Sequence, residues 1–150
     1  MKYLFENTLT ARNVKQHISH SFEVPPDSTR LELTLHFFPA QVGRLHNMLT
    51  LTLFDPDGFR GAGHRHGHRH QIIISPTEAT PGYAPGPLPS GEWLIQIDTH
   101  LILPGEPCRY SLEISIETAP TRSQSADWRI SEKNNRPVVN PRPGWYRGDL

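Results

Sequence analysis

The feature that most constrains the fold is a strict alternation of apolar and polar residues within short segments. In residues 108–117 (CRYSLEISIE), the even-numbered positions are apolar, aromatic or cysteine, and the odd-numbered positions are all polar or charged. Successive side chains of a β-strand point to opposite faces, so this period of two predicts a strand with one buried and one solvated face. No stretch of ten or more residues has the apolar spacing of a helix. We therefore expect an all-β chain.

The same alternation recurs along the chain and predicts further strands. It is found at 18–24, 30–38, 49–54 and 92–98, and 2–10 adds an edge strand. Residues 70–75 (HQIIIS) form a continuous apolar run, which predicts a central strand. Turn-forming residues separate these segments at 24–28 (VPPDS) and 54–59 (FDPDGF). Seven to eight strands at this spacing predict an antiparallel β-sandwich of jelly-roll or immunoglobulin-like type.

Two stretches without alternation define the organisation of the chain. Residues 75–92 contain five prolines and three glycines, and we expect them either to be ordered by packing of Tyr83 and Leu88 or to be a functional loop. After Glu117 the alternation stops and a Pro- and Ser-rich segment follows. We therefore expect a β-sandwich at 1–118, an extended C-terminal linker at 119–144, and the start of a further domain at 145–150.

Composition and charge exclude several classes of function. Lysine plus arginine and aspartate plus glutamate number 15 each in 150 residues, so no basic field is present to hold a nucleic acid. A single cysteine cannot form an intrachain disulfide and does not indicate an oxidising compartment. The N-terminus lacks the apolar segment of a signal peptide, and no apolar run is long enough to span a membrane. We expect a cytoplasmic protein with no nucleic-acid or membrane partner.

The most conspicuous candidate site is GAGHRHGHRH, with histidines at every second position: His64, His66, His68 and His70. On a strand all four imidazoles would lie on one face, and neighbouring pairs could share a zinc, nickel or copper ion. However, no carboxylate lies within the cluster, and Arg65 and Arg69 would repel a dication. A solvated edge strand or loop that is weakly His-rich is the favoured interpretation, adventitious metal binding is the second, and a functional metal site is the third.

A second candidate is Cys108, which together with His100 and Asp98 supplies the residue types of a thiol nucleophile site. Cys108, however, begins an alternating strand on its apolar face. A buried and inert thiol is therefore the favoured interpretation. Nothing in these residues by itself predicts an enzyme.

Several segments taken together indicate a family. They are LTLTLFDPDGFRGAGHR, ATPGYAPGPLPSGEW, HLILPGEPCRYSLEI and the ending PGWYRGDL. They resemble the N-terminal β-sandwich of a bacterial branch of the PHP (polymerase and histidinol phosphatase) metal-dependent hydrolases, which includes carbaryl-hydrolase-like and phosphoesterase-like proteins. The resemblance covers nearly the whole chain and is most specific at 55–65 and 79–93.

The resemblance implies a non-catalytic accessory module, with the chemistry in a barrel that follows. The barrel's metal ligands would lie beyond Leu150, so the resemblance implies no cofactor in this chain and divalent metals such as zinc or manganese only in the barrel. Residues 145–150 would begin the first barrel strand. The expected partner is this barrel in cis, and the expected interface residues are Val138, Val139, Trp145 and Tyr146.

Two other functions stay open at this point. The chain is alternatively a stand-alone binding or self-assembly module, which forms a homo-oligomer through its C-terminal tail. A third reading is a metal-binding protein that uses the histidine cluster.

Overall fold

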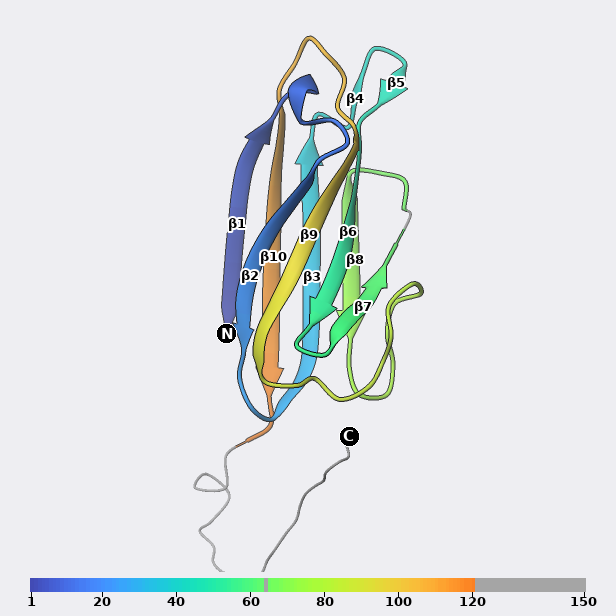
Figure 1. Ribbon diagram of the computed structural model, residues 1–150. Coiled ribbons are helices and arrows are strands. Elements are labelled where there is room, and N and C mark those ends of the chain that lie inside the picture. The colour runs from blue at the N-terminus through green and yellow to red at the C-terminus, as the bar shows by residue number, and fades with distance from the viewer. Residues whose placement is uncertain (64, 121–150) are drawn as a thin grey trace, which may run out of the picture.

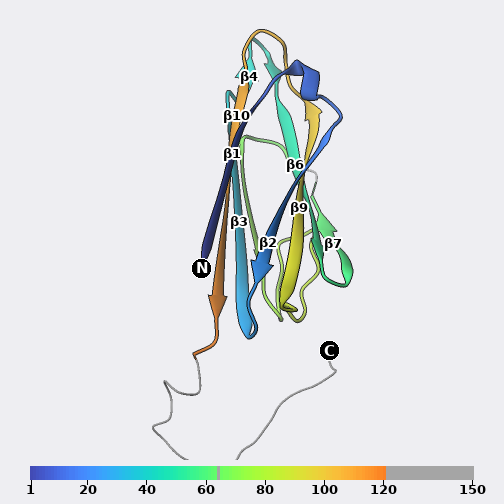
Figure 2. The same ribbon diagram turned by 60° about the vertical axis from the view of Figure 1, so that its left-hand side comes forward.

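The structure, a computed structural model, describes residues 1–63 and 65–120, and it consists of two four-stranded antiparallel sheets packed face to face (Figure 1; Figure 2). Sheet A contains, in spatial order, β1 (Lys2–Leu9), β10 (Cys108–Thr118), β3 (Ser28–Phe38) and β8 (Arg69–Ile74). Sheet B contains β2 (His17–Val24), β9 (Gly91–Leu101), β6 (Met48–Asp55) and β7 (Gly58–Ala62). A short hairpin, β4 (Gln41–Val42) and β5 (Leu45–His46), and a 3₁₀-helix, Ala11–Asn13, complete the described elements.

The order of the strands is that of a jelly roll. Among the eight sandwich strands the first pairs with the last (β1 with β10), the second with the seventh (β2 with β9), the third with the sixth (β3 with β8) and the fourth with the fifth (β6 with β7). All these pairs are antiparallel. The predicted antiparallel β-sandwich is confirmed, and of the two expected types the topology is the jelly roll.

The core lies between the sheets and is built from the apolar positions of the alternating segments. Every second residue is buried in β3 from Leu31 to Phe37 and in β10 from Cys108 to Ile116. The buried odd-numbered residues of β6 (49–53) and β9 (93–97) pack against them from the opposite sheet. The fully buried Trp93 donates its indole N–H to the carbonyl of Pro89 at 2.8 Å, which satisfies the polar atom of the largest core side chain. Each of the seven predicted segments overlaps a strand.

Two strands differ from the prediction. Residues 70–75 were expected to form a central strand, but β8 is at the edge of sheet A, so that prediction is wrong. The apolar run has another cause: Ile72 and Ile74 face the core, while Ile73 is partly covered where its N–H and C=O bond to Thr80 of the following loop. The short β7 was not predicted, because two glycines in five residues leave too little alternation to read.

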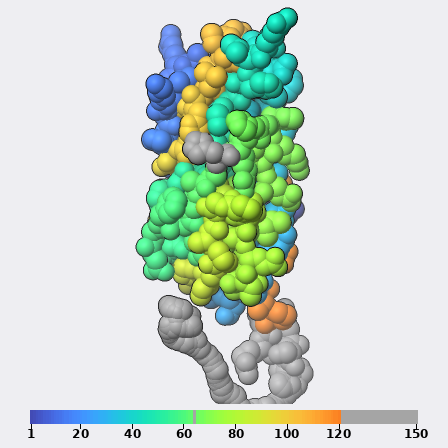
Figure 3. Space-filling view, turned by 90° about the vertical axis from the view of Figure 1, so that its right-hand side faces the viewer, coloured from blue at the N-terminus to red at the C-terminus, as the bar shows by residue number. Residues whose placement is uncertain are grey.

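The segment from 75 to 90 is ordered by packing. Tyr83 and Leu88 are both buried, as expected for the first of the two alternatives. The segment bridges to both sheets, through Tyr83 to Gly61 of β7 and through Ala79 to Ile74 of β8. It thereby covers the side of the sandwich between these two edge strands (Figure 3). Exposed strand edges invite pairing with other chains, so this cover protects two of the four edges.

The end of β10 at Thr118 coincides with the point where the alternation stops. Most of the expected linker, the expected further domain at 145–150 and the expected interface residues Val138, Val139, Trp145 and Tyr146 lie outside the described residues. No helix in the described part of the chain has the length and hydrophobicity needed to cross a membrane.

Candidate functional site

One buried arginine organises the end of the sandwich where β6 and β7 meet. Arg60 of β7 is 7% exposed, and its Nη1 lies 2.9 Å from Oδ2 of Asp55. Its remaining donors reach backbone carbonyls of the loop after Tyr83: Ala84 at 2.8 Å, Gly86 at 2.9 Å and Pro87 at 2.9 Å. The guanidinium carbon also lies 5.4 Å from the ring centroid of Trp93. We call this set, Asp55, Arg60, residues 84–87 and Trp93, the arginine corner.

A close backbone approach fixes the same loop beside β7. Gly61 has φ +149°, and a Cβ at this position would lie 2.6 Å from the Cα of Tyr83. Only glycine allows the two backbones to come so near in this conformation. The Tyr83 hydroxyl donates to the carbonyl of Leu51 at 2.8 Å, and burial raises the pKa of Tyr83 to about 12. The phenol is thus a structural anchor and stays protonated.

The arginine corner joins two segments that are far apart in the sequence. Residues 55–65 supply Asp55, Arg60 and Gly61, and residues 79–93 supply Tyr83, the carbonyls and Trp93. Every donor-bearing nitrogen of the guanidinium already has a protein acceptor. These residues therefore hold the end of the sandwich together, and four of the five N–H donors of the arginine bond to them.

The histidine cluster does not form one face of a strand. Residues 63 and 65–68 lie outside any strand, in the connection from β7 in sheet B to β8 in sheet A. His66 and His68 are exposed in this connection, while His70 follows the inward parity of β8 and is 3% exposed. His66, His68 and His70 therefore do not share one face of a strand, and His64 lies outside the described residues.

His70 is used inside the protein. Its Nε2–H donates to the carbonyl of Gly67 at 3.0 Å, and burial lowers the pKa of His70, which outweighs the raising effect of that bond. The ring of His68 instead packs edge-on against His36 of β3, with centroids 5.4 Å apart. In the described part of the chain, no three His, Cys, Asp or Glu side chains converge as metal ligands would. Adventitious metal binding by the cluster stays a prediction.

A polar network on the outer face of sheet B surrounds Asp98, which sequence reasoning placed with Cys108. Its carboxylate accepts hydrogen bonds from His17 Nδ1 at 2.6 Å, Thr52 Oγ1 at 2.6 Å and Gln96 Nε2 at 2.8 Å. Burial raises the pKa of Asp98, but the hydrogen bonds from Thr52, His17 and Gln96 together outweigh it and the net effect is a lowered pKa. The carboxylate is therefore held ionised.

Cys108 does not belong to this network. It belongs to β10 of sheet A and is fully buried among core residues, whereas Asp98 faces outwards from β9 of sheet B. Burial raises the pKa of the Cys108 thiol to about 11. Because the thiolate is the reactive form, the structure bears out the reading of a buried, inert thiol.

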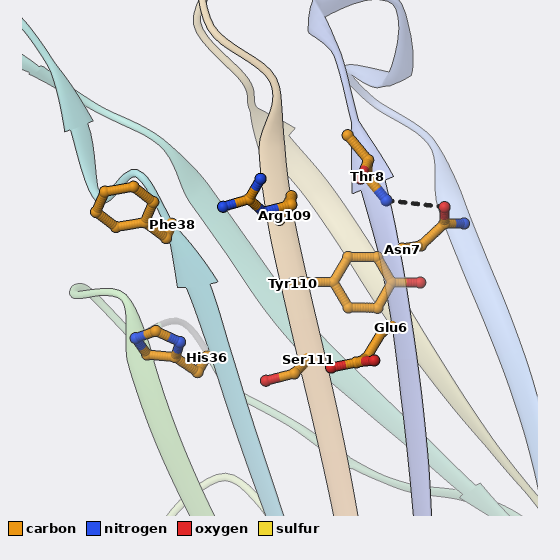
Figure 4. Close-up of a pocket in the computed structure, with 8 residues that line it drawn as sticks. All are labelled: Glu6, Asn7, Thr8, His36, Phe38, Arg109, Tyr110 and Ser111. Atoms are coloured by element: carbon orange, nitrogen blue, oxygen red, sulfur yellow. Dashed lines mark hydrogen bonds between the residues drawn. The ribbon is translucent and has the colours of Figure 1, made fainter.

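The outer face of sheet A carries a hollow of about 530 Å³ near the end of β3. It is lined by Glu6, Asn7, Thr8, His36, Phe38, Arg109, Tyr110 and Ser111 (Figure 4). Asn7 and Tyr110 already have hydrogen-bond partners: Asn7 Oδ1 accepts from the Thr8 N–H, and the Tyr110 hydroxyl bonds to His20. The outward-facing residues come from β1, β10 and β3, and sequence parity alone gave no sign that they adjoin.

Comparison with known proteins leaves the family open. Neither a scan against protein-family models nor a search of curated proteins found a match to this chain.

Proposed function

We propose that this chain is a non-catalytic accessory β-sandwich module of a PHP-type metal-dependent phosphoesterase or related hydrolase. The metal ions, zinc or manganese, would be bound by a catalytic barrel that follows in cis. A cytoplasmic location is part of this proposal, and the single cysteine is a buried free thiol, which is usual in reducing compartments.

The arginine corner is the observation that carries this proposal. The two segments most similar to the family are far apart in sequence, yet they meet in one buried ion-pair network. The turn from β6 to β7, beside which Asp55 and Arg60 lie, is at the same end of the sandwich as the end of β10 (Figure 1). A rigid end of the sandwich next to the end of β10 would help to position a domain that follows it.

The test is to read the gene beyond codon 150 and to assay the product. We expect a His-x-His-Thr metal motif within a few codons. We also expect hydrolysis of bis-p-nitrophenyl phosphate with Mn²⁺ by the extended protein and none by residues 1–150. A stop codon directly after Leu150, or metal-dependent hydrolysis by residues 1–150 alone, would overturn the proposal.

A stand-alone assembly module is the second candidate, and the free strand edges favour it. β1 and β2 are both edge strands and lie on the same side of the sandwich (Figure 1). An edge strand offers backbone donors and acceptors to a strand from another chain. Light scattering after size-exclusion chromatography distinguishes the two functions. An oligomer of the full chain that becomes a monomer on truncation at Pro120 supports assembly, and a monomer in both cases supports the accessory role.

A further inference from the structure

The outward side chains in the hollow on sheet A lie in two rows, which we call the platform. Strand pairing places Thr8, Arg109 and Phe38 side by side in one row. It places Glu6, Ser111 and His36 in the next. With strands ~4.8 Å apart and ~3.4 Å between successive residues, the platform measures roughly 10 by 7 Å. This is the scale of a small ring-shaped ligand lying on the sheet.

The two halves of this face differ in how their charges are satisfied. Away from the hollow, Arg30 pairs with Glu32 at 3.0 Å and with Glu117 at 3.4 Å, and Lys2 lies 3.9 Å from Glu113. In the hollow, Arg109 and Glu6 have no ion-pair or hydrogen-bond partner among residues 1–63 and 65–120, although they lie on adjacent strands. Figure 4 shows the guanidinium of Arg109 turned away from the Glu6 carboxylate.

An exposed aromatic ring lies beside these free polar groups. Phe38 is 56% exposed at the end of β3, directly across from Arg109. A ligand that covered this ring would gain hydrophobic free energy from its burial. The ring offers a flat face on which the C–H groups of a ligand can pack.

The charge of the platform selects the class of ligand. Glu6 would repel an anion and Arg109 would repel a cation, and the two charges cancel. The hollow combines a donor-only group (Arg109), an acceptor-only group (Glu6) and groups that do both, the hydroxyls of Thr8 and Ser111 and the imidazole of His36. A neutral ligand whose hydroxyls donate and accept at once matches this set.

From these observations we propose that the hollow on sheet A binds a neutral carbohydrate. The pyranose ring stacks on Phe38, and its hydroxyls bond to Arg109, Glu6 and Ser111. This binding site is independent of the proposed hydrolase and would serve either the accessory module or a stand-alone one.

The test is calorimetric titration of the full chain with cellohexaose, xylohexaose and mannohexaose, together with ¹⁵N–¹H spectra to map the amides that shift. We expect at least one of these probes to bind, with shifts centred on β10 and the end of β3. Phe38→Ala and Arg109→Ala should each weaken binding by at least about tenfold, since each removes a ring contact or a charged hydrogen bond.

Two matched variants separate the platform from general surface effects. Phe59→Ala removes a phenylalanine that is 68% exposed on β7 of sheet B, and Arg30→Ala removes an arginine from the paired half of the same face. Both should leave the affinity unchanged. The proposal is overturned if none of the three oligosaccharides binds, if Phe38→Ala and Arg109→Ala bind normally, or if the zwitterionic dipeptide Ala-Ala occupies the hollow in place of the sugars.

Discussion

Replacing Arg60 by leucine tests the role of the arginine corner most directly. The substitution keeps an apolar side chain over Trp93 but removes the ion pair to Asp55 and the donors to three carbonyls of the loop. The Asp55 side chain is 9% exposed, so its carboxylate would remain buried without a cation. We expect the loss of stability to come mainly from this uncompensated charge.

The magnitude follows from the burial of the pair. Breaking a buried ion pair by removing one partner costs about 3–5 kcal/mol. At about 2.1 cal/mol/K per residue, a sandwich of roughly 118 residues has an unfolding entropy of about 0.25 kcal/mol/K. A loss of about 4 kcal/mol therefore lowers the Tm by about 16 °C. Arg60→Lys should recover only part of this, because an ammonium cannot reproduce the planar fork that reaches four acceptors.

The measurement is thermal unfolding followed by circular dichroism, with Arg30→Leu as the matched control. Arg30 also bonds to two carboxylates, but its side chain is 36% exposed. Exposed pairs of this kind contribute about 0–1 kcal/mol, so this variant should lose at most about 4 °C. A loss below about 4 °C for Arg60→Leu, or equal losses for the two variants, would refute the assignment of a stabilising role to the corner.

Three further predictions concern single positions. Gly61→Ala should destabilise the protein by more than about 2 kcal/mol, because its Cβ would meet the backbone of Tyr83. Gly105→Ala, with φ +104° and open space around it, should cost only the backbone strain of about 1–2 kcal/mol. Equal losses of stability in urea unfolding would contradict this. Native Cys108 should not react with a thiol reagent at pH 8 and should react once unfolded, and rapid labelling of the native protein would be the contrary result. Asp98 has a lowered pKa in the folded state, so the unfolded state binds its proton first and stability falls as the pH drops below about 4. Asp98→Asn should reduce this loss of stability between pH 5 and pH 2, measured by urea unfolding. An unchanged loss would argue against the role of Asp98.

The sandwich could be predicted from the sequence because its core residues alternate regularly with outward-facing residues along each strand. Leu33 and Ile114, for example, each lie in an unbroken alternating segment, and each is fully buried. Where the chain passes from one sheet to the other, the alternation no longer predicts which side chains are buried. The histidines at every second position would lie on one face of a strand, but residues 65–68 lie in a connection between the two sheets, so His68 is exposed and His70 is buried.

The sites could not be predicted, because they depend on which outward residues adjoin. Parity shows that Arg109 and Phe38 face solvent, but only the pairing of β10 with β3 brings them together. A slip of two residues in that register would keep the same core parity and would place Arg109 against His36 instead. Arg60 is the opposite case. In the sequence, an arginine in a short, glycine-rich segment suggests an exposed charge, but the carbonyls of a loop some 25 residues later surround it. Non-local pairing therefore determines both which side chains adjoin on the surface of the sandwich and which polar side chains are buried.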